Sequence, residues 1–182
     1  MKKVFIIAEA GVNHNGIMAK AIQLIDAACA AGADAVKFQT FKAADVMTAF
    51  APKAVYQIKN SGREESQLDI VKKLELNYDQ HFKLSDYCRK KGIIFLSTPF
   101  DLSSIDLLHR MGVKTFKMPS GEMTNVPYLE KIGRLKKKII LSTGMADLHE
   151  IKSAVKILIR QGTPKSHITL LHCPTDYPTQ MN

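Results

Sequence analysis

TFKMPSG, residues 115–121, carries the main clue to the architecture of this chain. It reads as a short apolar strand whose chemically active side chains, Lys117 and Ser120, come at the carboxyl end, and Gly121 is expected to let the chain turn there. Five other runs are rich in Ile, Leu, Val or Phe and nearly continuous, as in strands buried on both faces of a parallel sheet. They are VFIIAE (4–9), AVKFQT (35–40), IIFLSTPF (93–100), IILSTG (139–144) and ITLLHC (168–173).

Helical patterns lie between these runs, so that a strand–helix unit repeats about six times. The exception is the long connection 41–77, which is polar in its middle and is expected to form an active-site loop plus an extra helix. Repeated units of this kind build either an open doubly wound sheet or a (β/α)₈ barrel. The predicted helices span residues 19–32, 78–92, 103–112, 125–135 and 147–162.

The positions of the polar residues favour the barrel. A TIM barrel gathers its active site from the carboxyl ends of many strands, whereas an open sheet usually carries one glycine-rich phosphate loop. The sequence has no such loop, and almost every predicted strand ends in a reactive side chain. These residues are Glu9, Lys37, Gln39, Thr98, Lys117, Ser120, Ser142, Thr143 and His172. We therefore predict an α/β fold, a TIM (β/α)₈ barrel of which about six units are present.

A closed barrel needs eight units, and the chain stops just after the sixth predicted strand. Residues 1–182 are therefore expected to be the N-terminal portion of a longer protein. The composition is that of an ordinary soluble globular protein, with 46% hydrophobic and 24% charged residues. The net charge of +9 is spread along the chain without arginine–aromatic interleaving, so we expect small anionic substrates and neither nucleic acid nor membrane as partners.

The three cysteines, Cys29, Cys88 and Cys173, are far apart and form no CxxC pair. This spacing argues against a disulfide framework and a structural zinc site, and it fits a reducing cytoplasm. Cys173 follows His172, which raises a Cys–His nucleophile as one interpretation. Adjacent residues on a strand point to opposite faces, so an ordinary structural role is favoured. A metal could use His172, but no second ligand has an obvious spacing.

Two cations and three hydroxyls fall at predicted strand ends. Lys37 and Lys117, with Thr98, Ser120 and Ser142, suit a phosphate, or a phosphate and a carboxylate on one ligand. Each lysine alone could be a surface residue whose stem covers apolar neighbours. Two lysines flanked by apolar strand residues are harder to explain in that way, because unpaired buried ammonium groups are costly.

Two further residues have alternative interpretations. Glu9 could act as a general base, bind sugar hydroxyls or form an ion pair with Lys37 on the neighbouring strand. His14 lies in GVNHNG (11–16), where asparagines and glycines tolerate positive φ. A turn is therefore predicted there, with a separate chemical role for His14 less favoured.

Six motifs, together and in order, resemble the sialic acid synthase family, the N-acetylneuraminate synthases and their bacterial relatives for legionaminic and pseudaminic acids. They are IIAEAGVNHNG (6–16), AVKFQT (35–40), LSTPF (96–100), FKMPSGE (116–122), LSTGMA (141–146) and LLHCPTDYPT (170–179). The resemblance implies a TIM barrel that condenses phosphoenolpyruvate with an N-acylated mannosamine-type sugar to give a nonulosonic acid and phosphate.

The resemblance also implies roles for individual residues. Catalytic roles would fall to Glu9, Lys117 and Glu122. Phosphoenolpyruvate would be bound by Lys37, Thr98, Lys117, Ser120 and Ser142, while Glu9, Gln39, Glu122 and Tyr177 would face the sugar or the attacking water. In similar enzymes an asparagine lies near the position of Thr175, which is the remaining candidate for substrate binding.

A divalent metal, typically manganese, would polarise the sugar aldehyde. The resemblance places its two histidine ligands, and an antifreeze-like domain that completes the sugar site across a homodimer, beyond Asn182. No metal ligand is therefore expected in this chain, which would be inactive alone. Two alternatives stay open: a Schiff-base aldolase or lyase that uses Lys117, and a truncated, non-catalytic barrel fragment.

Overall fold

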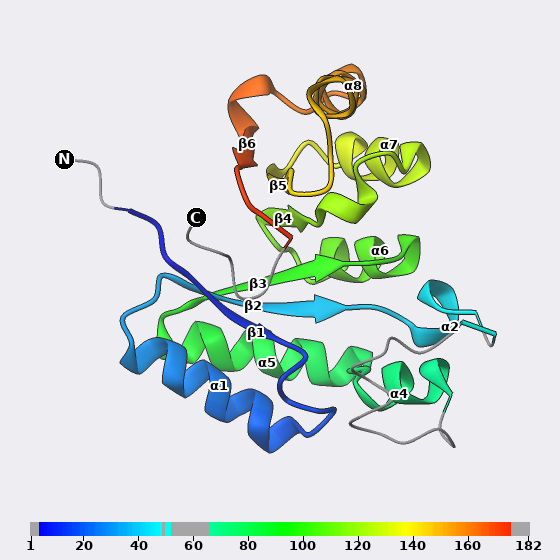
Figure 1. The fold of residues 1–182 in the computed structure, drawn as a ribbon. Helices are drawn as coiled ribbons and strands as arrows, with labels where there is room; N and C mark the ends of the chain where they lie inside the picture. Colours follow the sequence, from blue (N-terminus) through cyan, green and yellow to red (C-terminus); the bar gives the residue numbers. More distant parts are fainter. Residues whose placement is uncertain (1–3, 49, 52–65, 176–182) are drawn as a thin grey trace, which may run out of the picture. The chain divides into compact units, whose positions relative to one another are not determined.

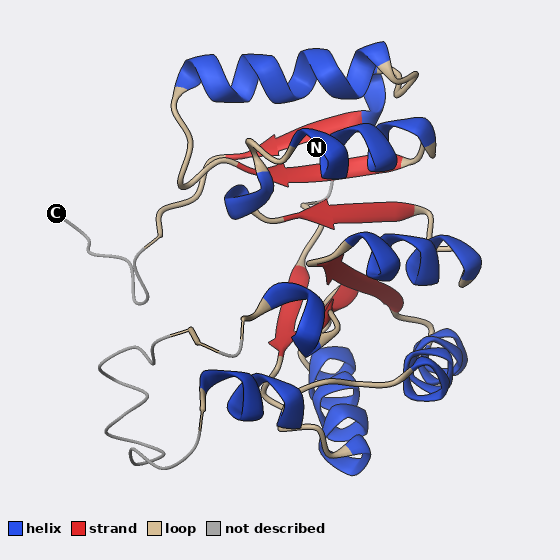
Figure 2. Cartoon of the chain, turned by 90° about the vertical axis from the view of Figure 1, so that its right-hand side faces the viewer, coloured by secondary structure: helices blue, strands red, loops and turns tan. Residues whose placement is uncertain are grey.

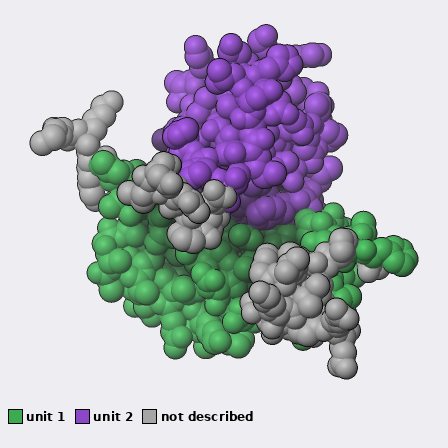
Figure 3. Space-filling model, in the orientation of Figure 1, with its two compact units in different colours: residues 1–95 green, residues 96–182 purple. Residues whose placement is uncertain are grey.

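The structure, a computed structural model, describes residues 4–48, 50–51 and 66–175. The chain divides into two compact units, residues 1–95 and 96–182 (Figure 3). Strands and helices alternate along both, as predicted, and the hydrogen-bonded strand orders are β1-β2-β3 and β4-β5-β6. No helix in the described ranges combines the length and the apolar character needed to cross a bilayer.

The first unit places two helices against a parallel strand pair. Strand β1 runs beside β2, and the long helices α1 and α5 contact each other on one side of that pair (Figure 1). Ile25, Phe38 and Leu84 are fully buried in its core. The elements are β1 (Ile7–Gly11), α1 (Met18–Ala30), β2 (Ala35–Thr40), α2 (Ala43–Val46), α4 (Gln67–Lys73) and α5 (Tyr78–Lys91).

The second unit is built around three parallel strands (Figure 2). The boundary between the two units, after Phe95, falls within strand β3. The elements are β3 (Ile94–Pro99), α6 (Leu102–Arg110), β4 (Thr115–Met118), the 3₁₀ turn η1 (Ser120–Glu122), α7 (Val126–Arg134), β5 (Lys138–Ser142), α8 (Leu148–Arg160), the 3₁₀ turn η2 (Lys165–His167) and β6 (Ile168–Leu171).

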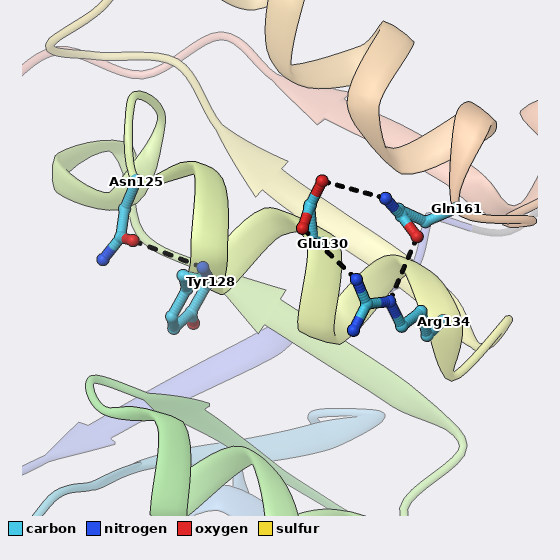
Figure 4. A network of polar contacts seen from close by, with 5 residues as sticks. All are labelled: Asn125, Tyr128, Glu130, Arg134 and Gln161. Atoms are coloured by element: carbon cyan, nitrogen blue, oxygen red, sulfur yellow. Dashed lines mark hydrogen bonds and ion pairs between the residues drawn. The ribbon is translucent and has the colours of Figure 1, made fainter.

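Helices α7 and α8 pack closely, and a polar network joins them (Figure 4). Gln161, just after α8, donates to Glu130 at 3.0 Å and accepts from Arg134 at 3.1 Å. A Cβ atom at Gly133 would lie 2.7 Å from the Cβ of Gln161, so only glycine permits this approach without a shift of the helices.

The predicted helices agree with the structure to within two residues at each end, but two strands differ. The first strand spans Ile7–Gly11 rather than 4–9, because its pairing partner β2 begins at Ala35, opposite Ile7. The fourth ends at Met118, and Ser120 lies in η1 instead of the strand. Within the connection 41–77, α2 and α4 confirm the expected extra helix, while residues 49 and 52–65 lie outside the described ranges.

Candidate active site

Glu9 and Lys37 form an ion pair on the adjacent strands of the first unit. They are direct partners in the β1–β2 register, and Lys37 Nζ lies 2.5 Å from Glu9 Oε2. The Lys37 side chain is 11% exposed and that of Glu9 is 54% exposed. The ion-pair interpretation of Glu9 is therefore confirmed. The exposed carboxylate also leaves Glu9 accessible to a ligand, so the pair does not rule out a chemical role.

A β-bulge gathers Gln39 beside this pair. The register between β1 and β2 shifts between Glu9 and Gly11, and Gly11 has φ of 52°. A Cβ atom at Gly11 would lie 3.4 Å from Glu9 Oε1 and 3.9 Å from Gln39 Nε2. The bulge corrects the prediction that Glu9 ends its strand: Glu9 lies inside β1, and the extra residue redirects the strand just after it.

Two fully buried histidines lie in the same unit. His14 occupies the predicted turn, with Asn15 and Gly16 at positive φ, and its Nδ1 accepts a hydrogen bond from the Gly16 N–H at 2.9 Å. Burial lowers the pKa of His14, and the nearby His81 lowers it further. His14 is therefore neutral and holds the turn that follows β1.

His81 ties helix α5 to the carboxyl end of β2. Its Nδ1 lies 2.9 Å from the carbonyl oxygen of Asn77 and its Nε2 lies 2.9 Å from Thr40 Oγ1. Because a carbonyl only accepts, Nδ1 carries the proton and Nε2 accepts from the Thr40 hydroxyl. Burial lowers the pKa of His81. The neutral ring thus supports the strand end that carries Lys37 and Gln39.

Lys117 and Ser142 meet in the second unit, as the sequence predicted. Lys117 is 8% exposed, and its ammonium donates to Ser142 Oγ at 2.7 Å and to the carbonyl of Met118 at 3.0 Å. Lys117 pairs with Ile140 in the β4–β5 register, and Ser142 lies two residues further along the same face of β5. A buried cation and a hydroxyl therefore converge at the carboxyl ends of neighbouring strands.

The thiol of Cys173 also belongs to this cluster, although the sequence did not predict it there. Its burial alone would raise the pKa of the thiol, but the Ser142 hydroxyl, the N–H groups of Thr143 and Gly144 and the charge of Lys117 together lower it. These donors can stabilise an anion at that position. The signal that could have found the cluster is the run Ser142–Gly144, whose backbone N–H groups follow directly on a parallel strand.

Gly144 permits the close passage of the segment after β6. A Cβ atom at Gly144 would lie 2.5 Å from the carbonyl oxygen of Cys173. Thr143 also binds this segment, since its N–H and its hydroxyl both donate to the carbonyl of Leu171, at 3.2 and 2.8 Å. His172 is exposed. The Cys–His nucleophile finds no support, because the groups beside the Cys173 thiol come from the β5 end instead.

The other predicted residues have varied settings. Thr98 is 3% exposed, near the carboxyl end of β3. Ser120 and Glu122 are partly buried in η1, where Glu122 Oε2 accepts from Asn125 Nδ2 at 2.6 Å. Thr175 is exposed at the end of the described ranges, and Tyr177 lies outside them.

The residues that the structure describes form no cluster of metal-ligating side chains. No group of three or more His, Cys, Asp or Glu side chains within residues 4–48, 50–51 and 66–175 could hold a metal ion. The donors around Lys117 carry protons and suit an anion rather than a cation.

Comparison with known proteins gives close relatives. The chain is 56% identical to N,N'-diacetyllegionaminic acid synthase of Campylobacter jejuni subsp. jejuni over 182 residues, which are 100% of this chain and 54% of that protein. It is 47% identical to N,N'-diacetyllegionaminic acid synthase of Legionella pneumophila subsp. pneumophila over 176 residues, which are 96% of this chain and 49% of that protein. The chain thus spans about half the length of the curated relatives it matches.

A solved structure supports the predicted fold class. The crystal structure of N-acetylneuraminic acid (sialic acid) synthetase from Leptospira borgpetersenii, in complex with citrate, superimposes with a TM-score of 0.82 at 33% identity. The match covers 99% of this chain and 57% of that chain. The α/β class is confirmed, and the chain covers part of a TIM barrel. Its motifs, its fold and the match of residues 24–182 to the family model agree: the chain belongs to the NeuB family.

Proposed function

We propose that the protein carrying this chain condenses phosphoenolpyruvate with an N-acylated mannosamine-type sugar to give a nonulosonic acid and phosphate. The observation that carries the proposal is the contact between the buried Lys117 ammonium and the Ser142 hydroxyl at strand ends. Together with the N–H groups of Thr143 and Gly144, it supplies donors for an anionic group. The names of the relatives, synthases of legionaminic and sialic acids, support a nonulosonic product.

The proposed roles follow the chemistry of each group. For phosphoenolpyruvate binding, the second unit supplies the candidate donors Lys117, Ser120, Ser142 and Thr98. The first unit supplies the candidate Lys37. Glu9, Gln39, Glu122 and Tyr177 serve the sugar or the attacking water, and Thr175 completes the substrate-binding set. Glu9 is suited to moving protons, because its carboxylate is half-exposed and is paired with the Lys37 ammonium.

The reaction balances with these groups. C3 of phosphoenolpyruvate forms a bond to the aldehyde carbon of the open-chain sugar, and the aldehyde oxygen takes a proton. Water then adds at C2, and the C–O bond to phosphate breaks. A divalent metal ion, proposed to be manganese, would act as a Lewis acid and would be held by residues outside this chain. The proposal also includes a homodimer of the whole protein.

The competing chemistry is an aldolase that forms an imine on Lys117. The protein at its natural length would be incubated with phosphoenolpyruvate, manganese and N-acylated mannosamine-type sugars, and the products identified by mass spectrometry. In parallel it would be treated with pyruvate and borohydride. The proposal expects a nonulosonic acid and no adduct on Lys117. A borohydride-stabilised adduct at Lys117, without any condensation product, would support the aldolase mechanism instead.

A further inference from the structure

The start of α7 contacts one predicted substrate residue, Glu122, and the neighbour of another, Thr98. Asn125 caps the helix, because its Oδ1 accepts from the N–H of Tyr128 at 3.2 Å (Figure 4). The other atom of the same amide, Nδ2, donates to Glu122 Oε2 at 2.6 Å. One side chain therefore fixes both the start of α7 and the direction of the Glu122 carboxylate.

Tyr128, three residues after Asn125, reaches the end of β3. Its side chain is 1% exposed, and its hydroxyl donates to the carbonyl oxygen of Pro99 at 2.7 Å. Pro99 directly follows Thr98, which is 3% exposed. Burial raises the pKa of Tyr128 well above its ordinary value, and the charges of Glu122 and Asp101 raise it further, so the hydroxyl stays a donor.

Packing alone does not account for this hydroxyl. A phenylalanine would fill the core with almost the same volume and would bring no polar atom into it. A buried hydroxyl is costly unless it is hydrogen-bonded, and here the bond goes to the backbone beside a proposed substrate contact. The amide of Asn125 likewise does more than cap the helix, since a serine or an aspartate would cap it equally well.

We propose that Tyr128 and Asn125 are positioning residues: Tyr128 sets Thr98 against phosphoenolpyruvate, and Asn125 sets Glu122 against the sugar. This inference rests on the proposed function and deepens it, because it predicts that each side chain affects one substrate more than the other. Neither residue touches the reacting atoms. Asn125 acts through its hydrogen bond to Glu122, and Tyr128 acts through its hydrogen bond to Pro99, the neighbour of Thr98.

The test for Tyr128 uses Tyr128→Phe in the protein at its natural length. Loss of one hydrogen bond is expected to raise KM for phosphoenolpyruvate about twofold to tenfold, with a smaller effect on kcat and on KM for the sugar. Tyr87→Phe is the matched control, because that hydroxyl donates to Asp26 at 2.9 Å, in a contact between α1 and α5. It should leave both KM values unchanged.

A double-mutant cycle separates positioning from general stability. If Tyr128 acts through Thr98, then Thr98→Val should raise KM for phosphoenolpyruvate by a smaller factor in the Tyr128→Phe variant than in the wild type. If the two substitutions instead raise KM for phosphoenolpyruvate by independent factors, the inference for Tyr128 is overturned. A Tyr128→Phe variant whose KM values match those of Tyr87→Phe would overturn it as well.

Asn125→Asp gives an independent test that leaves the core untouched. Aspartate keeps the cap but sets a second carboxylate beside Glu122, so KM for the sugar should rise while the melting temperature changes little. Equal losses with both substrates, in step with a lower melting temperature, would reveal a merely structural role. A wild-type protein that does not consume phosphoenolpyruvate at all would instead overturn the proposed function, and this inference with it.

Discussion

Gly144→Ala tests whether the segment after β6 is held against the β5 end as closely as the structure shows. The new Cβ atom would lie 2.5 Å from the carbonyl oxygen of Cys173, while ordinary contact begins at 3.4 Å, so the two atoms must separate by about 0.9 Å. Because the second atom belongs to the backbone, no side-chain rotation relieves the clash. The segment that carries Cys173 must move away from Ser142.

The expected loss in free energy of unfolding follows from comparison with a matched control, Gly121→Ala, in the same unit. Gly121 has nothing within 4 Å of its hypothetical Cβ atom, and neither Gly121 nor Gly144 has a positive φ. Replacing either glycine by alanine therefore gains the same entropy term of about 0.4–1 kcal/mol from the unfolded chain. Only Gly144→Ala adds overpacking, which costs about 1–3 kcal/mol. The two variants should differ in free energy of unfolding by that amount.

The assay is urea unfolding of the wild type, Gly121→Ala and Gly144→Ala, followed by circular dichroism. Gly144→Ala should unfold at a lower urea concentration than Gly121→Ala, and its melting temperature should be lower by about 2–12 °C. Equal unfolding midpoints for the two variants would refute the reasoning, because the close approach of Cys173 to Gly144 would then carry no energetic consequence.

Two further predictions concern titratable groups. Iodoacetamide should label Cys173 faster than Cys88 at pH 8, because the neighbours of Cys173 lower its pKa while burial raises the pKa of Cys88 to about 12. Inorganic phosphate should slow the labelling of Cys173, and equal rates with and without phosphate would contradict an anion site there. The buried histidines His14 and His81 have lowered pKa values, so the folded state binds fewer protons than the unfolded state below pH 6.5. Stability should be full above about pH 6.5 and should fall as the pH drops, by up to about 1.4 kcal/mol per pH unit for each histidine. His81→Gln should make this fall shallower, as measured by urea unfolding between pH 8 and pH 5, and an unchanged slope would speak against a buried neutral His81.

The order of elements could be predicted because it depends on local patterns. Nearly continuous apolar runs identified the parallel strands, and residues such as Gly92, at φ of 74°, marked the ends of helices. The meeting of Lys117 with Ser142 followed from the same logic, since the carboxyl ends of parallel strands lie at one edge of a sheet. Both inferences needed only the direction and the period of each strand.

The features that were missed depend on neighbours far away in the sequence. The chain does turn at Gly121, in η1, but the turn does not require a glycine, because φ there is not positive and the space around it is open. Gly144 and Gly133 are among the glycines that tertiary neighbours require, and no local pattern shows this. The bulge after Glu9 and the donors around Cys173 are of the same kind, because each arises from a second segment brought close by folding.

Isotope tracing tests the central proposal most directly. The protein at its natural length would convert phosphoenolpyruvate and an N-acylated mannosamine-type sugar in water enriched in oxygen-18, and the released phosphate would be analysed by mass spectrometry. Condensation through C3 with water adding at C2 breaks the C–O bond, so the proposal predicts a nonulosonic acid and phosphate without oxygen-18. Phosphate that carries one oxygen-18 atom, or phosphate released without any condensation product, would contradict it.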